Sequence, residues 1–251
     1  MSAPQTYPNA VHEKTTWWGT FPIEFPLKIG DIVQHDSNGG LSYVSNIQTK
    51  LGAGVIFRTE SKPVSAAATW SHHASRNRAA TVEGGATTAT GVGAQAAVKV
   101  SFSAIAGFVL DYVAGTYHRL VDVDAAKRAV LGLAKNGQWE SNYVLVTEMI
   151  EASPATVIAS SAQNSSVLLS ASVALPDNVA GINLADPKFG FSSSSSTDGV
   201  YQSVSAKSFP LYHCIKLRRK WWGGKTAELQ AAVSINLDKA FTDDPFEDEN
   251  V

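Results

Sequence analysis

The sequence predicts an α+β fold in which a twisted antiparallel sheet carries a few helices. Apolar side chains recur at every second position in several stretches, and a period of two is typical of strands. Turn-forming residues separate these stretches. Apolar residues at helical spacing occur in two segments, so we expect strands to outnumber helices.

Composition limits the class of protein. The chain has 251 residues, enough for one large or two small domains. Charged residues make up 17%, below the roughly 25% that is usual, and Ser, Ala, Thr and Gly take their place, a mix common in barrel strands. We find no run of about 18 apolar residues and no secretory signal, so neither a transmembrane helix nor export is expected. One cysteine excludes an internal disulfide and fits a reducing cytosol.

The first third of the chain predicts short elements. We expect an irregular segment up to residue 20, a short strand or turn within 27–33, and a hairpin turn at 37–40, where Ser-Asn-Gly-Gly favours reversal. A short strand should cover 55–58. Residues 59–97 are rich in Ala, Thr, Ser and Gly, which predicts mobile or edge strands.

The longest alternation covers residues 98–112. Every even position there is apolar or small: Val98, Val100, Phe102, Ala104, Ala106, Phe108, Leu110 and Tyr112. As one strand it would place these side chains on one face, and it could cross a bilayer, which takes roughly 9–11 tilted residues. A second alternation covers 167–175. A large sheet with one face on the core is the alternative interpretation of both.

The remaining elements follow in order. Asp122 or Asp124 can cap a helix that ends at Gly137. Residues 143–150 are apolar on both faces and predict a buried central strand. The five serines of 192–196 predict a flexible tip. Further strands are expected at 156–160, 200–205 and 209–218, and a second helix at 225–240.

Signatures of enzymes are weak. The chain has no nucleophile elbow, zinc-protease, phosphate-loop or paired-cysteine motif. Cys214 lies in a strand pattern and predicts a packing thiol. His72 and His73 are neighbours on a strand and should point apart, which suits surface histidines better than a metal site. Glu148 and Glu151 should also face opposite ways, so we predict no catalytic residue, no metal and no cofactor.

A basic cluster with two tryptophans lies near the C-terminus. It consists of Lys216, Arg218, Arg219, Lys220, Trp221, Trp222 and Lys225. Tryptophan beside cations suits a layer of lipid headgroups. The same pattern would suit single-stranded nucleic acid, or a strand end with Trp on the core and cations in water. The net charge of −2 and the acidic tail from Asp238 onward argue against broad nucleic-acid affinity.

Four segments together resemble the pore-forming domain of gasdermins. PLKIGDIV at 26–33 is similar to an early strand of that domain, and the region leading into 98–112 occupies the place of its first inserting hairpin. NYVLVTEMIEA at 142–152 resembles the strand that opens the second hairpin, and KSFPLYHCIKLR at 207–218 resembles the strand that closes it. The compact fungal regulator-of-cell-death members, which govern allorecognition, are the most similar.

The resemblance implies a non-enzymatic pore-forming effector of cell death. Such a protein would be cytoplasmic when soluble and would act at the plasma membrane. It would bind anionic phospholipid through the basic cluster, form a homo-oligomer or a hetero-oligomer with an allelic variant, and insert two hairpins per subunit into a β-barrel. The lipid-facing residues would be Val98, Val100, Phe102, Phe108, Leu110, Val167, Leu169 and Val173. A β-rich binding or structural module without membrane activity is the alternative.

The chain departs from the family in three places. It has the Trp17-Trp18 segment where animal gasdermins have a basic helix, and about 26 residues after Lys225 where they have a large inhibitory domain. It also lacks the N-terminal cysteine that compact bacterial relatives use for lipidation. We therefore expect a pore-forming domain over 1–225, followed at 226–251 by a helix and acidic tail that could mask the basic cluster.

Overall fold

Strands dominate the protein, and their antiparallel pairing confirms the expected α+β class. The computed structural model describes residues 3–35, 40–52, 54–64, 67–80, 96–197, 199–218 and 237–245. The helices are α1 (Ala3–Thr15), α2 (Ile47–Leu51), α3 (Val123–Lys135), the 3-10 helix η1 (Pro187–Phe189) and α5 (Leu237–Ala240). The strands are β1 (Trp18–Gly19), β2 (Asp31–His35), β3 (Leu41–Asn46), β4 (Thr59–Val64), β5 (Ala68–His72), β6 (Ala74–Ala80), β7 (Ala96–Phe102), β8 (Phe108–Leu120), β9 (Tyr143–Ser160), β10 (Ser166–Ser170), β11 (Ser192–Ser196), β12 (Val200–Ser205), β13 (Ser208–Leu217) and β14 (Phe241–Thr242).

Ten of these strands form one large sheet around β9. On one side β9 pairs with β2 and then β8, and on the other side with β13 and then β12. β4 and β5 pair with the far edge of β8. Residues 143–150 are therefore central, as predicted, and the strand continues without a break to Ser160.

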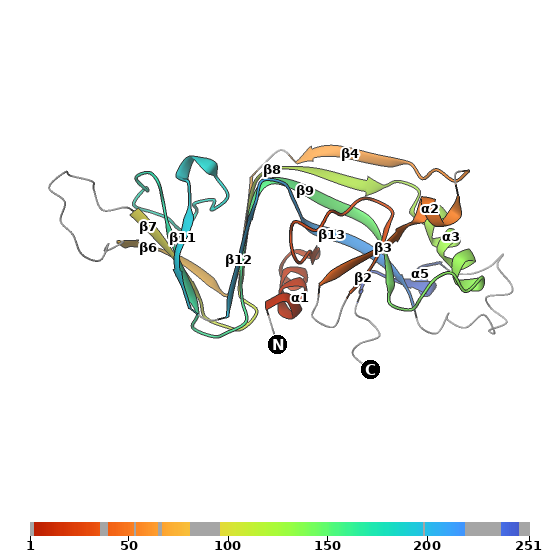
Figure 1. Ribbon diagram of the computed structural model, residues 1–251, viewed down its shortest axis with the longest axis horizontal. Helices are drawn as coiled ribbons and strands as arrows, with labels where there is room; N and C mark the ends of the chain where they lie inside the picture. Colours follow the sequence, from red (N-terminus) through yellow and green to blue (C-terminus); the bar gives the residue numbers. More distant parts are fainter. Residues whose placement is uncertain are drawn as a thin grey trace.

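A second sheet of four strands lies at one end of the elongated molecule. Its order is β11-β10-β7-β6, and it forms the left end of Figure 1. The residues at 192–196, predicted to be a flexible tip, are strand β11 of this sheet. Serine has a weak preference for strands, but pairing with β10 outweighs that preference.

The N-terminal residues form helix α1 rather than an irregular segment. Tyr7, Ala10 and Val11 lie on one face of the helix, and all three are buried against the large sheet. Pro8 within the helix obscures this spacing in the sequence. The aromatic ring of Tyr7 meets that of Phe108 of β8 edge to face, at 5.8 Å between centroids.

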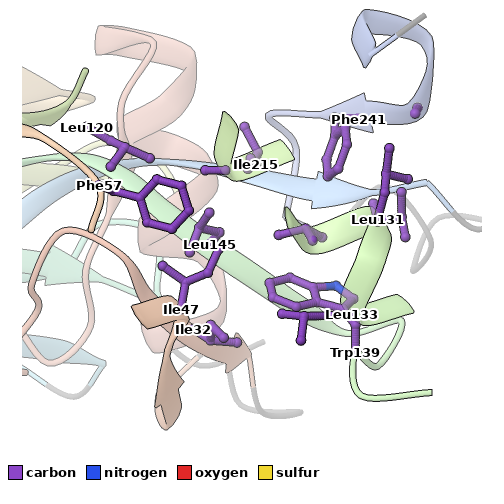
Figure 2. Close-up of a cluster of buried hydrophobic side chains, with 14 residues drawn as sticks. Ile32, Ile47, Phe57, Leu120, Leu131, Leu133, Trp139, Leu145, Ile215 and Phe241 are labelled. Atoms are coloured by element: carbon purple, nitrogen blue, oxygen red, sulfur yellow. The ribbon is translucent and has the colours of Figure 1, made fainter. Parts of the chain in front are cut away.

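The opposite end of the large sheet carries α3, which confirms the helix expected after Asp122. Figure 2 shows how Leu131, Leu133 and Trp139 pack on side chains of the sheet, among them Leu145. Phe241 of β14 closes this cluster from the C-terminal segment. We call the residues of this cluster the anchored end. They are Ile32, Ile47, Phe57, Leu120, Ala126, Val130, Leu131, Leu133, Trp139, Leu145, Ile215, Leu217, Ala240 and Phe241.

Two further expectations are partly tested. β2 and β3 pair as the predicted hairpin, although residues 36–39 of its turn lie outside the described residues. Of the helix expected at 225–240, the structure describes 237–240, which are helical. Residues 59–97 contain β4, β5 and β6, each of which pairs on one side only within the described strands, as edge strands do.

Candidate functional site

Four chain segments run through both sheets in the same lateral order. β5 continues into β6, β8 follows β7, β9 continues into β10, and β12 follows β11. The order is β5-β8-β9-β12 in the large sheet and β6-β7-β10-β11 in the small one. The small sheet is thus the same four-stranded ribbon, folded back on itself. We call the links at His73, at 103–107, at 161–165 and at Thr197 and Gly199 the four crossings.

The two central segments keep one common register through the fold. Phe108 faces Ala159 in the large sheet, and Ser101 faces Ser166 in the small one. The number of residues from Phe108 back to Ser101 equals the number from Ala159 forward to Ser166. Neither segment therefore contains an extra residue at the crossing. Backbone bonds bridge the crossing: the Ser160 amide donates to the Gly107 carbonyl at 2.8 Å, and the Phe102 amide donates to the Ser165 carbonyl at 2.9 Å.

The outer segments do not share this continuity. His72 faces Phe108 and Ala74 faces Phe102, so His73 alone lies opposite 103–107. β10 and β11 also contain a register shift, between Leu168 and Leu169. The central pair could therefore straighten with its pairing intact, whereas the outer strands would have to slide.

Each crossing contains a residue in the left-handed backbone region. Their φ angles are 50° at His73, 65° at Ala106, 59° at Asn164 and 81° at Gly199. For a residue other than glycine this conformation costs roughly 1–2 kcal/mol. Straight strands would not require it, so folding back stores backbone strain at the crossings.

The crossing at 103–107 divides the alternation that the sequence suggested was one strand. Val98, Val100 and Phe102 of β7 pack in one cluster with Val109 of β8. The even residues of β8, namely Phe108, Leu110 and Tyr112, pack instead in a different cluster beneath α1. The expectation of one continuous face over 98–112 is wrong for this conformation, because the left-handed Ala106 shifts the alternation by one residue.

An irregular segment covers the apolar face of the small sheet. This cover segment comprises residues 171–191 and includes η1. Leu175, Val179, Ile182, Leu184 and Phe189 of the cover segment pack on Val98, Val100, Phe102, Val167 and Leu169. Val173, predicted to continue the β10 pattern, lies beyond the end of that strand and its side chain is 45% exposed.

The other face of the small sheet is polar. Serines and Lys99 line an open pocket of about 460 Å³ with His73 and Asn164 at the crossings. Leu168, Ser195 and Thr197 line a second pocket on the same face, again with Lys99. The small sheet therefore has one apolar face, now covered, and one hydroxyl-rich face in contact with water.

A buried ion pair lies where the two sheets face each other. Nη2 of Arg76 in β6 donates to Oδ1 of Asp111 in β8 at 2.8 Å, and both side chains are almost completely buried. Oδ2 of Asp111 accepts a further hydrogen bond from the Leu184 amide, so both oxygens of the carboxylate have a partner. The sequence does not indicate this pairing, because the two residues are 35 positions apart and Arg76 lies outside both alternating stretches.

The predicted basic cluster is described only in part. The Lys216 side chain is 3% exposed, and its Nζ donates to the Pro245 carbonyl at 2.9 Å. The Arg218 amide donates to the Ala240 carbonyl at 3.0 Å. Residues 237–245 thus lie beside this end of β13, where β14 pairs with it. Arg219, Lys220, Trp221, Trp222 and Lys225 lie outside the described residues.

The described residues also show how the predicted chemical groups are placed. In the described part of the chain no three His, Cys, Asp or Glu side chains could hold a metal ion. Burial raises the pKa of the Cys214 thiol, which keeps it protonated. The rings of His72 and His73 lie 4.0 Å apart rather than pointing away from each other, because His73 leaves the strand at a crossing. No described helix is long and apolar enough to cross a bilayer.

No protein-family model matches the sequence, and no protein with curated annotation matches it. The solved structure of a bacterial gasdermin from Bradyrhizobium tropiciagri is similar with a TM-score of 0.36 at 14% identity, and the match covers 97% of this chain and 93% of that one.

Proposed function

We propose that this protein permeabilises membranes by straightening its folded ribbon into two β-hairpins per subunit. The observation that supports this most is the common register of the central segments, Phe108 with Ala159 and Ser101 with Ser166. A single register lets β7–β8 and β9–β10 form one long antiparallel pair. Each would exceed the roughly 9–11 residues that a tilted strand needs to cross a bilayer.

The faces of the ribbon fit this proposal. If the left-handed residue at Ala106 relaxes, the alternation over 98–112 is restored. Val98, Val100 and Phe102 then share a face with Phe108 and Leu110, and Val167 and Leu169 join them from the neighbouring strand. Lys99 and Ser101 fall on the opposite face, which would line a water-filled lumen.

Two arginines set the depth of insertion. Arg76 and Arg78 of β6 face Val100 and Val98, on the apolar side of the ribbon. An arginine on the lipid side costs roughly 2–4 kcal/mol at the bilayer midplane and little near the interface. We therefore place both at the level of the headgroups, where guanidinium groups bind the phosphates of an anionic lipid.

Oligomerisation follows from the open edges. Among the described strands, β6 and β11 pair on one side only, so the ribbon has two free edges. In lipid each unpaired backbone group costs several kcal/mol, and a closed ring removes the edges. The partners are further copies, either identical or allelic variants. The protein would be cytoplasmic before assembly and would act at the plasma membrane.

Release of a trapped dye tests the proposal. Vesicles of phosphatidylcholine, with and without phosphatidylserine, are loaded with carboxyfluorescein and mixed with the full chain. We expect leakage that depends on the anionic lipid. Full leakage by this chain alone would show that an allelic variant is not required, and leakage only with such a variant would show that it is.

A fluorophore scan tests the assignment of faces. In a Cys214→Ser background, single cysteines at Val98, Lys99, Val100 and Ser101 carry an environment-sensitive dye. We expect the even positions to report lipid and the odd positions water once leakage begins. Equal environments at Lys99 and Val100 would refute the proposed strand orientation.

A binding or structural module is the second candidate. An open groove of about 1050 Å³ exposes Tyr43 and Ile56, whose side chains are 57% and 83% exposed. Apolar side chains in an open groove are typical of interaction surfaces. Absence of leakage from every vesicle, together with a fixed oligomer in solution, would favour this candidate.

A further inference from the structure

The Arg76–Asp111 ion pair is the one described charged contact between buried side chains that joins the two sheets. Arg76 belongs to β6 of the small sheet and Asp111 to β8 of the large one. The side chains are 4% and 0% exposed. Straightening the ribbon would separate them, because they lie on either side of the His73 crossing.

The same pair also holds the cover segment. Oδ2 of Asp111 accepts a hydrogen bond from the Leu184 amide at 2.6 Å, and Nη1 of Arg76 donates to the Ile182 carbonyl. Between them, Nδ2 of Asn183 donates to the Tyr112 carbonyl at 2.8 Å. Three consecutive residues of the cover segment are therefore fixed to this point.

The chemistry of the pair suits a contact that must open. A buried ion pair gains little over an apolar pair, since both charges lose their hydration. Loss of one partner is strongly destabilising, because it leaves a buried charge uncompensated. When the sheets separate, however, water solvates both charged groups, so the open form regains the hydration free energy that burial removed. An apolar pair would lose stability on opening instead.

We propose that Arg76 and Asp111 form the latch of the folded ribbon, and that their separation releases the small sheet and the cover segment together. The consequence for leakage rests on the proposed function. The opening itself can be measured in solution without any membrane.

Hydrogen exchange tests the latch against a matched control. Arg78 is two residues from Arg76 on the same face of β6, and its Nη1 lies 2.8 Å from Oδ1 of Asp177, but that pair is exposed. We expect Arg76→Gln and Asp111→Asn to speed exchange roughly 100-fold at the Leu184 amide and at the amides of β7 and β10. Exchange at 144–150 of β9 should stay unchanged, and in solution Arg78→Gln should show the exchange rates of the unmodified protein.

With the single variants, two outcomes would overturn the latch. One is equal behaviour of Arg76→Gln and Arg78→Gln. The other is faster exchange throughout both sheets, which would indicate loss of overall stability. If the single variants do not fold, the double variant Arg76→Met/Asp111→Leu decides, because it removes both charges. We expect this variant to fold and to exchange no faster than the unmodified protein at the amides of β7 and β10, and faster exchange there would refute the latch.

Hydrogen exchange and dye leakage together distinguish the latch hypothesis from the proposed function. Local opening in Arg76→Gln with no leakage by any variant would support the latch and refute membrane permeabilisation. Leakage by the unmodified chain, with no local opening in Arg76→Gln, would support permeabilisation and refute the latch.

Discussion

The anchored end and the folded ribbon bury similar apolar side chains in different ways. At the anchored end, a regular helix and the C-terminal segment cover the sheet, and Leu145 and Trp139 pack between them. In the ribbon, the irregular cover segment covers the apolar face of the small sheet instead. The ribbon also contains strained crossings and a buried ion pair. β9 belongs to both regions. The difference therefore lies in what covers the strands, and we expect the ribbon to be the part that moves.

The largest effect is expected at the anchored end. Leu145 of β9 is fully buried there, and Leu145→Ala should lower the free energy of unfolding by about 3–5 kcal/mol. Urea unfolding followed by circular dichroism measures this, and the whole protein should unfold in one transition. As a control, Val204→Ala at a 59% exposed position should change stability by less than about 0.5 kcal/mol. A loss below about 1 kcal/mol for Leu145→Ala would show that this end is not the anchor.

The same substitution in the ribbon sharpens the comparison. Leu169 of β10 is also fully buried, but its contacts are with the cover segment. We expect Leu169→Ala to cost about 2–3 kcal/mol locally. Amides of β7 and β10 should exchange faster while those of 144–150 keep their protection, and leakage should begin sooner. A uniform rise in exchange would mean that the two regions unfold as one unit.

Strain at a crossing can be changed in both directions at one position. Ala106→Gly removes the cost of its positive φ and should stabilise the folded ribbon by about 1 kcal/mol, which delays leakage. Ala106→Val increases that cost and should hasten leakage. The lag before dye release measures both. The same lag in the two variants would show that backbone strain at this crossing does not affect the rate of dye release.

The smallest effect on stability is expected on the polar face. Lys99 is exposed, so Lys99→Glu should change the free energy of unfolding by less than about 0.5 kcal/mol. In a lumen the new charge should nevertheless shift ion selectivity toward cations, as measured by reversal potentials in planar bilayers. Lys135→Glu on α3 provides the control and should leave selectivity unchanged. An unaltered reversal potential for Lys99→Glu would place this face outside the lumen.

Local patterns predicted the anchored end better than the ribbon. The apolar spacing of 122–137 is confirmed as α3, although the Asp122 side chain makes no capping hydrogen bond, and the apolar run at 143–150 is confirmed as central strand β9. These signals are local, and the packing agrees with them. The hairpin of β2 and β3 was likewise recognisable from its turn residues.

The ribbon could not be predicted in the same way, because its shape depends on contacts distant in sequence. Alternation over 98–112 shows two faces but not the left-handed Ala106 that exchanges them. The serines at 192–196 become a strand only through pairing with β10. Arg76 and Asp111 lie in unrelated stretches until the fold brings them together. The lipid-facing residues and the headgroup contacts stay predictions.

The register of the central pair also determines how fast each part of the ribbon can respond. β7–β8 and β9–β10 need not change register when the ribbon straightens. The backbone hydrogen bonds between these two segments can therefore persist during the change. β6 and β11 must first break their backbone hydrogen bonds to β7 and β10, and then form new ones with other residues of the same neighbouring segments. Conversion should therefore show a fast phase from the middle strands and a slower phase from the two edges.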